Sequence, residues 1–428
     1  MKPNPERKLE NSRSFFSGYF FANCPASSVL KFKQKSCFNC YAVVYYKGND
    51  KRKVRLMKLL KVCASRYKNC CDGFTVDLVA RSKKTGEDKE YELQEIAEGL
   101  YVYSTAAFVG KNASGKTSAI ELLHGCYSIL GEFRLRDAYG QYDNTALEIC
   151  FFHEGYVYRY TTVLRSAPGL GSQANFTEQH IYRKKYYKSK AKGIYETADF
   201  EEMAGFGDLP EDTSLVFFVL KKKNTRGVYF HCDGEGTDTY PLLFRAMKTY
   251  GIPKTVLTKV IKIFDDQIRD LDMVDEHRYR LVYQQEEREL SDTELIHMLS
   301  SGTTKGVLLY LYAVAALENG FDLLIDEVEN HFHKTLVENL ISLFKDKSVN
   351  RKSATLIFTT HYCEVLDLFN RQDNIWIAKS GEKISLENMY ETYNLRPELL
   401  KSRRFYSNAF ATAVNYEDLM ALKKELMK

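Results

Sequence analysis

The chain contains the stretch Gly110-Lys111-Asn112-Ala113-Ser114-Gly115-Lys116-Thr117, which fits the pattern G-x-x-x-x-G-K-[ST] of a phosphate-cradling loop. An apolar run at 106–109 precedes it and predicts a buried strand. Residues 118–123 follow with apolar side chains at helical spacing and predict the start of a helix. In such a strand, loop and helix, the loop amides and the helix N-terminus bind anionic oxygens at one spot. The sequence therefore predicts a P-loop.

The P-loop predicts ATP and Mg²⁺ as cofactors and assigns a role to each polar side chain. Lys116 is expected to reach the β- and γ-phosphates, and the Thr117 hydroxyl is expected to coordinate Mg²⁺. The residues expected to contact the nucleotide are Gly110, Asn112, Ala113, Ser114, Gly115, Lys116, Thr117 and Ser118.

The composition is that of an ordinary soluble protein, with 44% hydrophobic and 27% charged residues. A chain of 428 residues is too long for one simple core and predicts two or three subdomains. The net charge of +5 permits an anionic partner without requiring one. No apolar run reaches the roughly 18 residues of a membrane span, and no signal peptide is recognisable. We therefore expect a cytoplasmic protein with no membrane partner.

The ten cysteines are expected to be reduced thiols, as is usual in the cytosol. Cys37 and Cys40 have the spacing of half a zinc site, but no second Cys-x-x-Cys follows. The adjacent Cys70 and Cys71 are a poor substitute, because neighbouring side chains rarely ligate one metal. Zinc at these N-terminal cysteines stays an alternative, and ordinary thiols are the favoured interpretation.

Antiparallel strands are predicted on both sides of the P-loop. Strands are indicated at 41–46, 74–79 and 90–96, and together they predict a β-rich lobe. Two further runs at 147–152 and 156–163 predict a hairpin that turns at Glu154-Gly155.

Beyond the hairpin, predicted strands and helices are mixed. An apolar run at 214–220 predicts a buried strand. Helices are predicted at 240–250 and 253–271, the second because its apolar residues share one face. The alternating residues at 277–283 predict a return to strand.

The stretch 182–192 interleaves basic residues with tyrosines. Lys and Arg neutralise phosphates and aromatic rings stack on bases, so this stretch is a candidate surface for DNA or RNA. An exposed strand or loop on an insertion would have the same composition, and the sequence does not decide between the two.

A second group of polar residues, between 326 and 361, follows directly after two predicted strands. The buried run 321–325 ends in Asp326-Glu327, and the run 354–360 ends at His361. Carboxylates at the C-terminal end of parallel strands lie at the ligand crevice of an open α/β sheet. Asp326 is expected to hold the Mg²⁺ shell, Glu327 to act as general base on the attacking water, and His361 to hydrogen-bond the γ-phosphate.

Four motifs together resemble the ABC-type ATPase heads of the SMC, double-strand-break repair and OLD-like group: GKNASGKT, LSSGTTKG, LLIDEVENHFH and LIFTTHY. The chain is most similar to bacterial AAA ATPases of phage-defence and abortive-infection systems, over roughly residues 90–406. The resemblance implies an α/β fold, a P-loop NTPase of ABC-ATPase type with an antiparallel β subdomain and a helical insertion carrying the signature motif.

The resemblance also divides the chain into five predicted segments. These are 1–99, an N-terminal β-rich lobe; 100–165, the P-loop unit and β subdomain; 166–298, an inserted β/helical lobe; 299–379, the ATPase core with signature, Walker B and His switch; and 380–428, a C-terminal tail.

In the family, the signature motif of one subunit completes the ATP site of the other, which implies a homodimer through the ATP sites. Ser300 and Gly302 would then contact the γ-phosphate held by the partner's Lys116. Asn330 and His331 would lie on the loop that crosses the dimer interface.

The sequence departs from the family pattern at several positions. Ser301 replaces a usual glycine and Thr303 stands where Gln or Glu is common. No clear Q-loop, the family segment whose glutamine contacts the metal, is found. Gln141 is the candidate for this glutamine. His331 and His333 form an H-x-H, which we interpret as loop and helix-start residues and not as a metal site.

The resemblance implies an ATPase that hydrolyses ATP with Lys116, Glu327 and His361 as catalytic residues. Neither the long coiled coils of SMC proteins nor the Toprim nuclease domain of OLD proteins is recognisable. We therefore expect an ATPase that controls a separate effector, a nuclease or toxin, in anti-phage defence. The alternatives are a DNA repair or maintenance ATPase that acts on DNA ends, and a scaffold that binds ATP without turnover.

Overall fold

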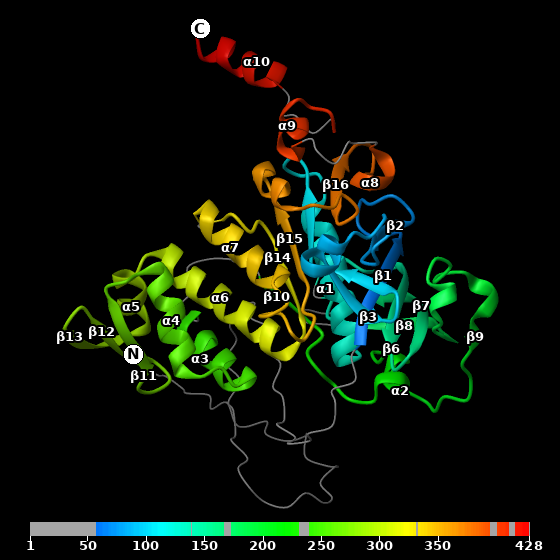
Figure 1. Cartoon of the computed structure of the whole chain (residues 1–428), viewed down its shortest axis with the longest axis horizontal. Helices are drawn as coiled ribbons and strands as arrows, with labels where there is room; N and C mark the ends of the chain where they lie inside the picture. The colour runs from blue at the N-terminus through cyan, green and yellow to red at the C-terminus, as the bar shows by residue number, and fades with distance from the viewer. Residues whose placement is uncertain are drawn as a thin grey trace, which may run out of the picture. The chain divides into compact units, whose positions relative to one another are not determined.

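The computed structural model describes residues 57–137, 139–166, 173–230, 239–330, 333–393, 400–410 and 416–427 (Figure 1). The predicted strand at 41–46, the Cys37/Cys40 pair and His331 lie outside these residues.

A six-stranded, mostly parallel sheet carries the P-loop (Figure 1). Its order is β10-β14-β15-β5-β16-β17, and all neighbouring strands are parallel except β17, which runs antiparallel to β16. The strands are β10 Gly227–Phe230, β14 Asp322–Ile325, β15 Leu356–Thr360, β5 Thr105–Val109, β16 Ile375–Ser380 and β17 Ile384–Asn388. The P-loop strand and the strands expected to precede Asp326 and His361 are therefore confirmed.

Both faces of this sheet are covered, which explains why its strands are continuous apolar runs. On β5, Ala106 and Phe108 face the core that contains helix α1 (Lys116–Glu132). Ala107 and Val109 face the opposite core, which contains helices α6 (Ser301–Asn319) and α7 (Lys334–Lys345). The result is an α/β fold, as predicted.

A second six-stranded sheet is antiparallel throughout, with the order β2-β1-β6-β7-β8-β9. Its strands are β2 Phe74–Asp77, β1 Met57–Ser65, β6 Ala146–His153, β7 Tyr156–Ser166, β8 Ala174–Lys185 and β9 Glu201–Glu202. The β6–β7 hairpin turns at Glu154-Gly155, both in the left-handed region at φ 51° and 83°, as expected for this turn. This sheet is the predicted antiparallel β subdomain.

The second sheet packs on α1 with one face, and the β3–β4 hairpin packs on part of the other. β3 spans Leu93–Ala97 and β4 spans Leu100–Tyr103. The strand predicted at 90–96 therefore begins later than expected, because Asp88–Glu92 form one π-helical turn.

A buried ion pair fastens the two large sheets to each other. Lys58 Nζ on β1 lies 2.5 Å from Asp322 Oδ1 on β14, and both side chains are almost fully buried. The same carboxylate accepts hydrogen bonds from the Tyr127 hydroxyl on α1 and from the amide of Thr355. The β subdomain is thus anchored to the start of the strand that ends in Asp326.

The helical insertion contains α3, α4, a three-stranded sheet and α5, and it leads into α6. The elements are α3 Thr239–Tyr250, α4 Lys254–Phe264, β11 Ile268–Met273, β12 Arg278–Tyr283, β13 Glu286–Ser291 and α5 Asp292–Met298. The prediction of a helix through residue 271 was wrong beyond Phe264. The Asp265 carboxylate accepts the amide of Gln267, and this local turn ends the helix before β11 begins.

The predicted strand at 214–220 was also wrong, because helix α2 (Val216–Leu220) occupies this position. Val216 and Leu220, four residues apart, are buried on one face, whereas Phe217 is exposed. A short apolar run fits a buried strand and a helical turn equally well, so its sequence could not decide.

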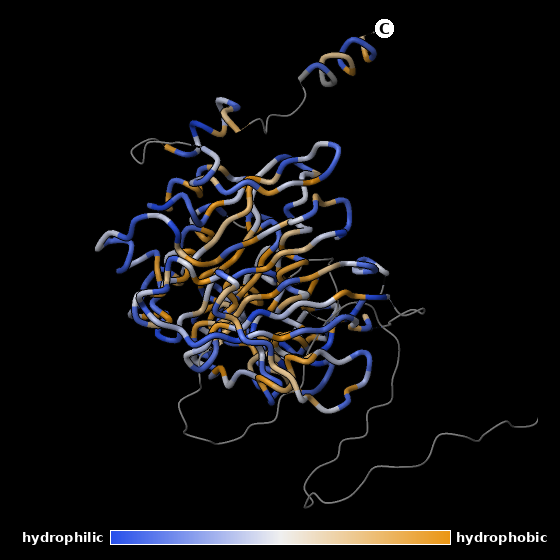
Figure 2. The backbone as a smooth tube through the Cα atoms, turned by 90° about the vertical axis from the view of Figure 1, so that its right-hand side faces the viewer, coloured by the Kyte–Doolittle hydropathy of each residue, from blue (hydrophilic) through white to orange (hydrophobic). Residues whose placement is uncertain are grey.

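The remaining elements are short: 3₁₀ turns Lys188–Lys190, Thr197–Asp199 and Cys363–Leu368, and helices α8 Met389–Thr392, α9 Lys401–Tyr406 and α10 Tyr416–Leu426. Hydrophobic segments concentrate in the inner strands and hydrophilic segments on the connecting loops (Figure 2). None of the described helices has the length and apolar character that crossing a membrane requires.

Candidate nucleotide-binding site

The P-loop backbone requires glycine at two positions. Gly110 has φ 156°, and a Cβ there would lie 2.5 Å from the Ala378 carbonyl oxygen and 2.6 Å from Ser114 Oγ. Gly115 has φ 97°, and a Cβ there would lie 2.2 Å from Cγ2 of Ile384 on β17. The loop is therefore folded against β16 and β17, and larger residues at either glycine would displace it.

Lys116 is the first residue of α1 and is only 5% exposed. Its Nζ donates to the carbonyl oxygens of Gly110 and Lys111, both at 3.1 Å, so the ammonium lies within the loop. Burial lowers the pKa of Lys116, and the carboxylates of Glu327 and Asp326 oppose this shift. The acidic pair is thus close enough to act electrostatically on the P-loop lysine.

Thr117 connects the P-loop to the acidic pair directly. Its Oγ1 donates to Asp326 Oδ2 at 2.7 Å. Asp326 follows β14, which is separated from β5 by β15, so the parallel sheet brings together two residues far apart in sequence. A hydroxyl and a carboxylate in contact are the oxygen ligands that Mg²⁺ prefers, and these two residues fit such an ion.

Ser114 Oγ is buried and has no hydrogen-bond partner among the described residues. A buried hydroxyl without a partner costs free energy, and a ligand oxygen in the loop would satisfy it. Together with the Lys116 ammonium and the loop amides, this hydroxyl gives the P-loop the donor set that a phosphate requires. The residues present therefore fit a nucleotide phosphate.

Glu327 and His361 lie side by side at the edge of the site. The distance between Glu327 Oε1 and His361 Nε2 is 3.7 Å, and both side chains are partly exposed. Glu327 Oε2 accepts a hydrogen bond from Asn330 Nδ2 at 2.5 Å. Exposed carboxylate oxygen next to the P-loop lysine is the placement that a general base needs.

The residues 326–330 after β14, here named the Walker B turn, include one residue, Glu329, and contact another, Thr359, that the sequence analysis did not single out. Thr359 on β15 hydrogen-bonds both Asp326 and Glu327. Glu329, 8% exposed, accepts the amide of His361 through Oε1, and its Oε2 has no hydrogen-bond partner among the described residues. The one sequence signal at Thr359 is a polar residue at the end of an apolar strand, and this signal does not reveal which residues it contacts.

The signature residues lie at the start of α6. Ser300 is the N-cap, and its exposed hydroxyl accepts the amide of Thr303 at 2.9 Å. Gly302 belongs to the first turn of the helix. No contact among the described residues joins Ser300 or Gly302 to the P-loop of the same chain. Their assignment to a nucleotide site stays a prediction that needs a second copy.

The remaining candidates have local contacts. The side chain of Gln141 is exposed, and the one contact described for this residue is from its amide to Asp137 Oδ1 at 2.7 Å. Its role at the metal therefore stays a prediction. His333 is the N-cap of α7 and accepts the amide of Thr335, in agreement with its interpretation as a helix-start residue. Over the described residues, no group of three His, Cys, Asp or Glu side chains is arranged to hold a metal.

Three lysines of the basic stretch 182–192 interact with other groups of the same chain. Lys184 is 7% exposed and donates to the carbonyl oxygens of Gly193 and Glu196. Lys188 pairs with Glu98 at 2.8 Å and Lys190 with Asp199 at 2.6 Å. Two exposed cations, Arg183 and Lys185, lie over the rings of Tyr156 and Tyr187.

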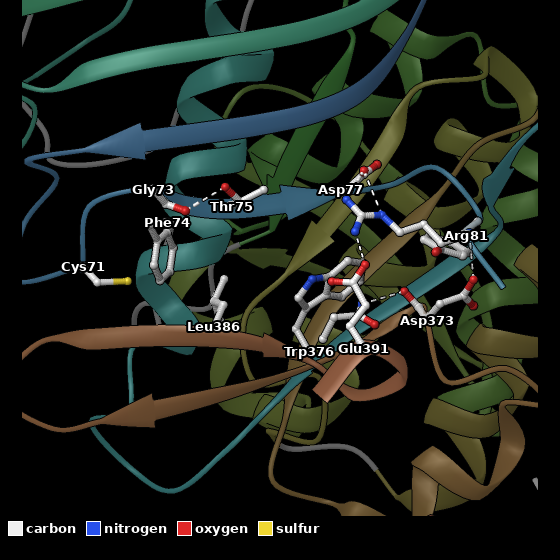
Figure 3. Close-up of a pocket in the computed structure, with 12 residues that line it drawn as sticks. Cys71, Gly73, Phe74, Thr75, Asp77, Arg81, Asp373, Trp376, Leu386 and Glu391 are labelled. Atoms are coloured by element: carbon white, nitrogen blue, oxygen red, sulfur yellow. Dashed lines mark hydrogen bonds and ion pairs between the residues drawn. The ribbon is translucent and has the colours of Figure 1, made fainter. Parts of the chain in front are cut away.

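A cavity of about 140 Å³ between β2 and β16–β17 lies apart from this chemistry (Figure 3). Its residues include Asp77, Arg81 and Glu391 but none from the P-loop or the Walker B turn. Arg81 pairs with Asp77 at 2.7 Å and also contacts Glu391. The lining holds three carboxylates, those of Asp77, Asp373 and Glu391, and one cation, Arg81, and this excess of negative charge disfavours a nucleotide phosphate there.

Among known families, a model described as "AAA domain, putative AbiEii toxin, Type IV TA system" matches residues 106–367, more than half of the chain. No curated protein matches the sequence.

Among solved structures, the chain is similar to "SMC head domain from Thermotoga maritima", with 13% identity and a TM-score of 0.38, over 77% of this chain and 98% of that one. It is also similar to "Crystal structure of the SmcHead bound to the C-winged helix domain of ScpA", with 10% identity and a TM-score of 0.39, over 79% and 99%. At these values neither likeness carries an argument about activity or partners. The family match shows that the chain belongs to the AAA-domain family described above, as the resemblance of its motifs to AAA ATPases predicted.

Proposed function

We propose that this protein is a Mg²⁺-dependent ATPase whose active site is built from the P-loop and the Walker B turn. The observation that carries this proposal is the 2.7 Å hydrogen bond from Thr117 Oγ1 to Asp326 Oδ2. It joins two of the three predicted metal ligands, and in the chain Lys116 directly precedes Thr117 and Glu327 directly follows Asp326.

Each residue has a distinct part in the proposed reaction. Lys116 and the loop amides bind the β- and γ-phosphates, while Thr117 and Asp326 hold Mg²⁺. The ion, when bound, supplies charge neutralisation for the transferred phosphoryl group. Glu327 accepts the proton of the attacking water, and His361, 3.7 Å from Glu327, donates a hydrogen bond to the γ-phosphate.

The proposal includes a homodimer in which the second copy supplies Ser300 and Gly302. Ser300 is exposed at the N-terminus of α6, where the helix dipole and the first amides favour an anion. Such a site would be complete only when two chains and the nucleotide are together.

At the level of the cell, we propose that the ATP cycle controls a separate effector, a nuclease or toxin, in anti-phage defence. This part rests on the resemblance of the motifs to ATPases of phage-defence systems. The description of the matched family names a putative toxin of a type IV toxin–antitoxin system and no separate effector. A DNA maintenance ATPase is the alternative. Its candidate surface loses the buried Lys184, and Lys188 and Lys190 are exposed but paired with Glu98 and Asp199. Arg183 and Lys185 are therefore the exposed cations to test first.

The test is ATP turnover by the purified full chain with and without Mg²⁺. We expect turnover that stops on removal of Mg²⁺, and loss of nucleotide binding in Lys116→Ala because the phosphates lose their buried cation. Glu327→Gln should bind ATP but hydrolyse it at least about 100-fold more slowly, because removal of a general base lowers the rate by this order. Equal turnover in Glu327→Gln and in the wild type would contradict the catalytic assignment.

A further inference from the structure

The Walker B turn is held in place by the last residues of β15. The Thr359 hydroxyl donates to Asp326 Oδ1 at 2.5 Å and accepts the amide of Glu327 at 2.7 Å. The Thr359 carbonyl accepts the amide of Val328 at 3.0 Å. One fully buried residue therefore contacts three consecutive residues of the turn.

The turn needs this support because its backbone is strained. Glu327 has φ 50°, in the left-handed region, which costs a residue with a side chain about 1–2 kcal/mol. The amide that it exposes in this conformation is the one that Thr359 Oγ1 binds. The hydrogen bond thus favours the backbone conformation that turns the Glu327 side chain toward His361.

The same hydroxyl also orients the metal carboxylate. Asp326 Oδ2 faces Thr117, a proposed Mg²⁺ ligand, whereas Oδ1 is occupied by Thr359. Only a hydroxyl can donate to a carboxylate and accept from an amide through one atom. Valine, of similar shape, would leave both Asp326 Oδ1 and the Glu327 amide without this partner.

We infer that Thr359 is a positioning residue that sets the metal carboxylate and the general base at the same time. The inference rests on the proposed function, because it assigns to Asp326 and Glu327 their roles in ATP hydrolysis. Thr359 itself is fully buried on β15 and acts only through these two residues. Partners of this kind alter metal affinity or activity by about 10–100-fold when removed.

The test compares Thr359→Val with Thr359→Ser, which keeps the hydroxyl. Thr360→Val is the matched control, because Thr360 is equally buried but its hydroxyl accepts only the amide of Tyr362. Three properties are measured: the kinetics of ATP turnover (kcat and KM), their dependence on the Mg²⁺ concentration, and the binding of a fluorescent ATP analogue with and without Mg²⁺. Melting temperatures identify variants that fail to fold. If Thr359→Val fails to fold, Thr359→Ala takes its place in the comparison.

We expect Thr359→Val to lower kcat about 10–100-fold, to require more Mg²⁺, and to bind the analogue normally without Mg²⁺. Thr359→Ser and Thr360→Val should stay near wild type in all three. Wild-type kcat and Mg²⁺ dependence in Thr359→Val would overturn the inference, as would equal losses in Thr359→Ser. Absence of turnover in the wild-type protein would instead overturn the proposed function. In that case, comparing the Mg²⁺-dependent binding of the analogue between the wild type and Thr359→Val would still test the role of Thr359.

Discussion

At the scale of single residues, the P-loop shows how far local sequence determines a site. The pattern of Gly110, Gly115 and Lys116 was recognisable because these residue types have reasons within the loop itself: a backbone with positive φ at the glycines and the charge of the lysine. The roles of Thr359 and Glu329 were not recognisable. They depend on which strand lies beside β14, and the neighbours of a strand are set by the tertiary fold.

Gly115 gives a direct prediction at this scale. In Gly115→Ala, the left-handed backbone would cost about 1–2 kcal/mol, and the new Cβ would also meet Ile384. We expect nucleotide affinity to fall about tenfold or more, measured by titration with a fluorescent ATP analogue. Gly86→Ala is the control, because no atom lies within 4 Å of its Cβ position and its φ is not positive. An unchanged affinity in Gly115→Ala would show that the loop conformation described here does not bind phosphate.

At the scale of elements, long patterned segments were predicted well and short apolar runs were not. The β6–β7 hairpin and helix α3 match their predictions because alternation or helical periodicity extends over their full length. The run 214–220 has no periodicity from which helix could be told from strand. In α2, Val216 and Leu220, four residues apart, are the residues of the helix that are buried in the core. The end of α4 was missed because one Asp side chain, Asp265, ends the helix inside an apolar pattern.

Neighbouring lysines at the end of β8 differ in burial: Lys184 is buried and Lys185 is exposed. Lys184→Gln should destabilise the protein by about 1–3 kcal/mol, because the buried side chain loses its hydrogen bonds to two backbone carbonyl groups. Lys185→Gln should leave stability unchanged, since this side chain is exposed. Urea denaturation of both variants measures the difference.

The same variants bear on the DNA alternative. A salt-sensitive affinity for DNA that weakens in Lys185→Gln and Arg183→Gln, with stability intact, would favour a nucleic-acid role for this surface. We expect no such effect from a protein that gates a separate effector.

At the scale of the whole molecule, the fold class followed from the order of the motifs, since a P-loop, an acidic pair and a histidine after successive strands require a parallel sheet. The way in which the antiparallel β subdomain attaches to the parallel sheet could not be predicted from the sequence. It depends on the buried pair of Lys58 and Asp322, and Lys58 is one lysine among many in the sequence. Burial of both charges is tolerated because Tyr127 and Thr355 complete the hydrogen bonds of the carboxylate.

We propose that two chains share each ATP site. In a symmetric dimer, each site would combine Lys116 and Glu327 of one chain with Ser300 of the other. Lys116→Ala and Ser300→Arg should each be inactive alone, because every site of either dimer lacks one group. A mixed dimer of the two variants would contain one site with both groups intact.

The most direct measurement is therefore ATP turnover in an equimolar mixture of Lys116→Ala and Ser300→Arg. We predict that activity returns to about a quarter of the wild-type value, because half of the randomly formed dimers contain one intact site. A mixture of Lys116→Ala and Glu327→Gln is the control and should stay inactive, since both residues belong to the same half of the site. Absence of recovery in the first mixture, or wild-type turnover by Ser300→Arg alone, would contradict the shared site.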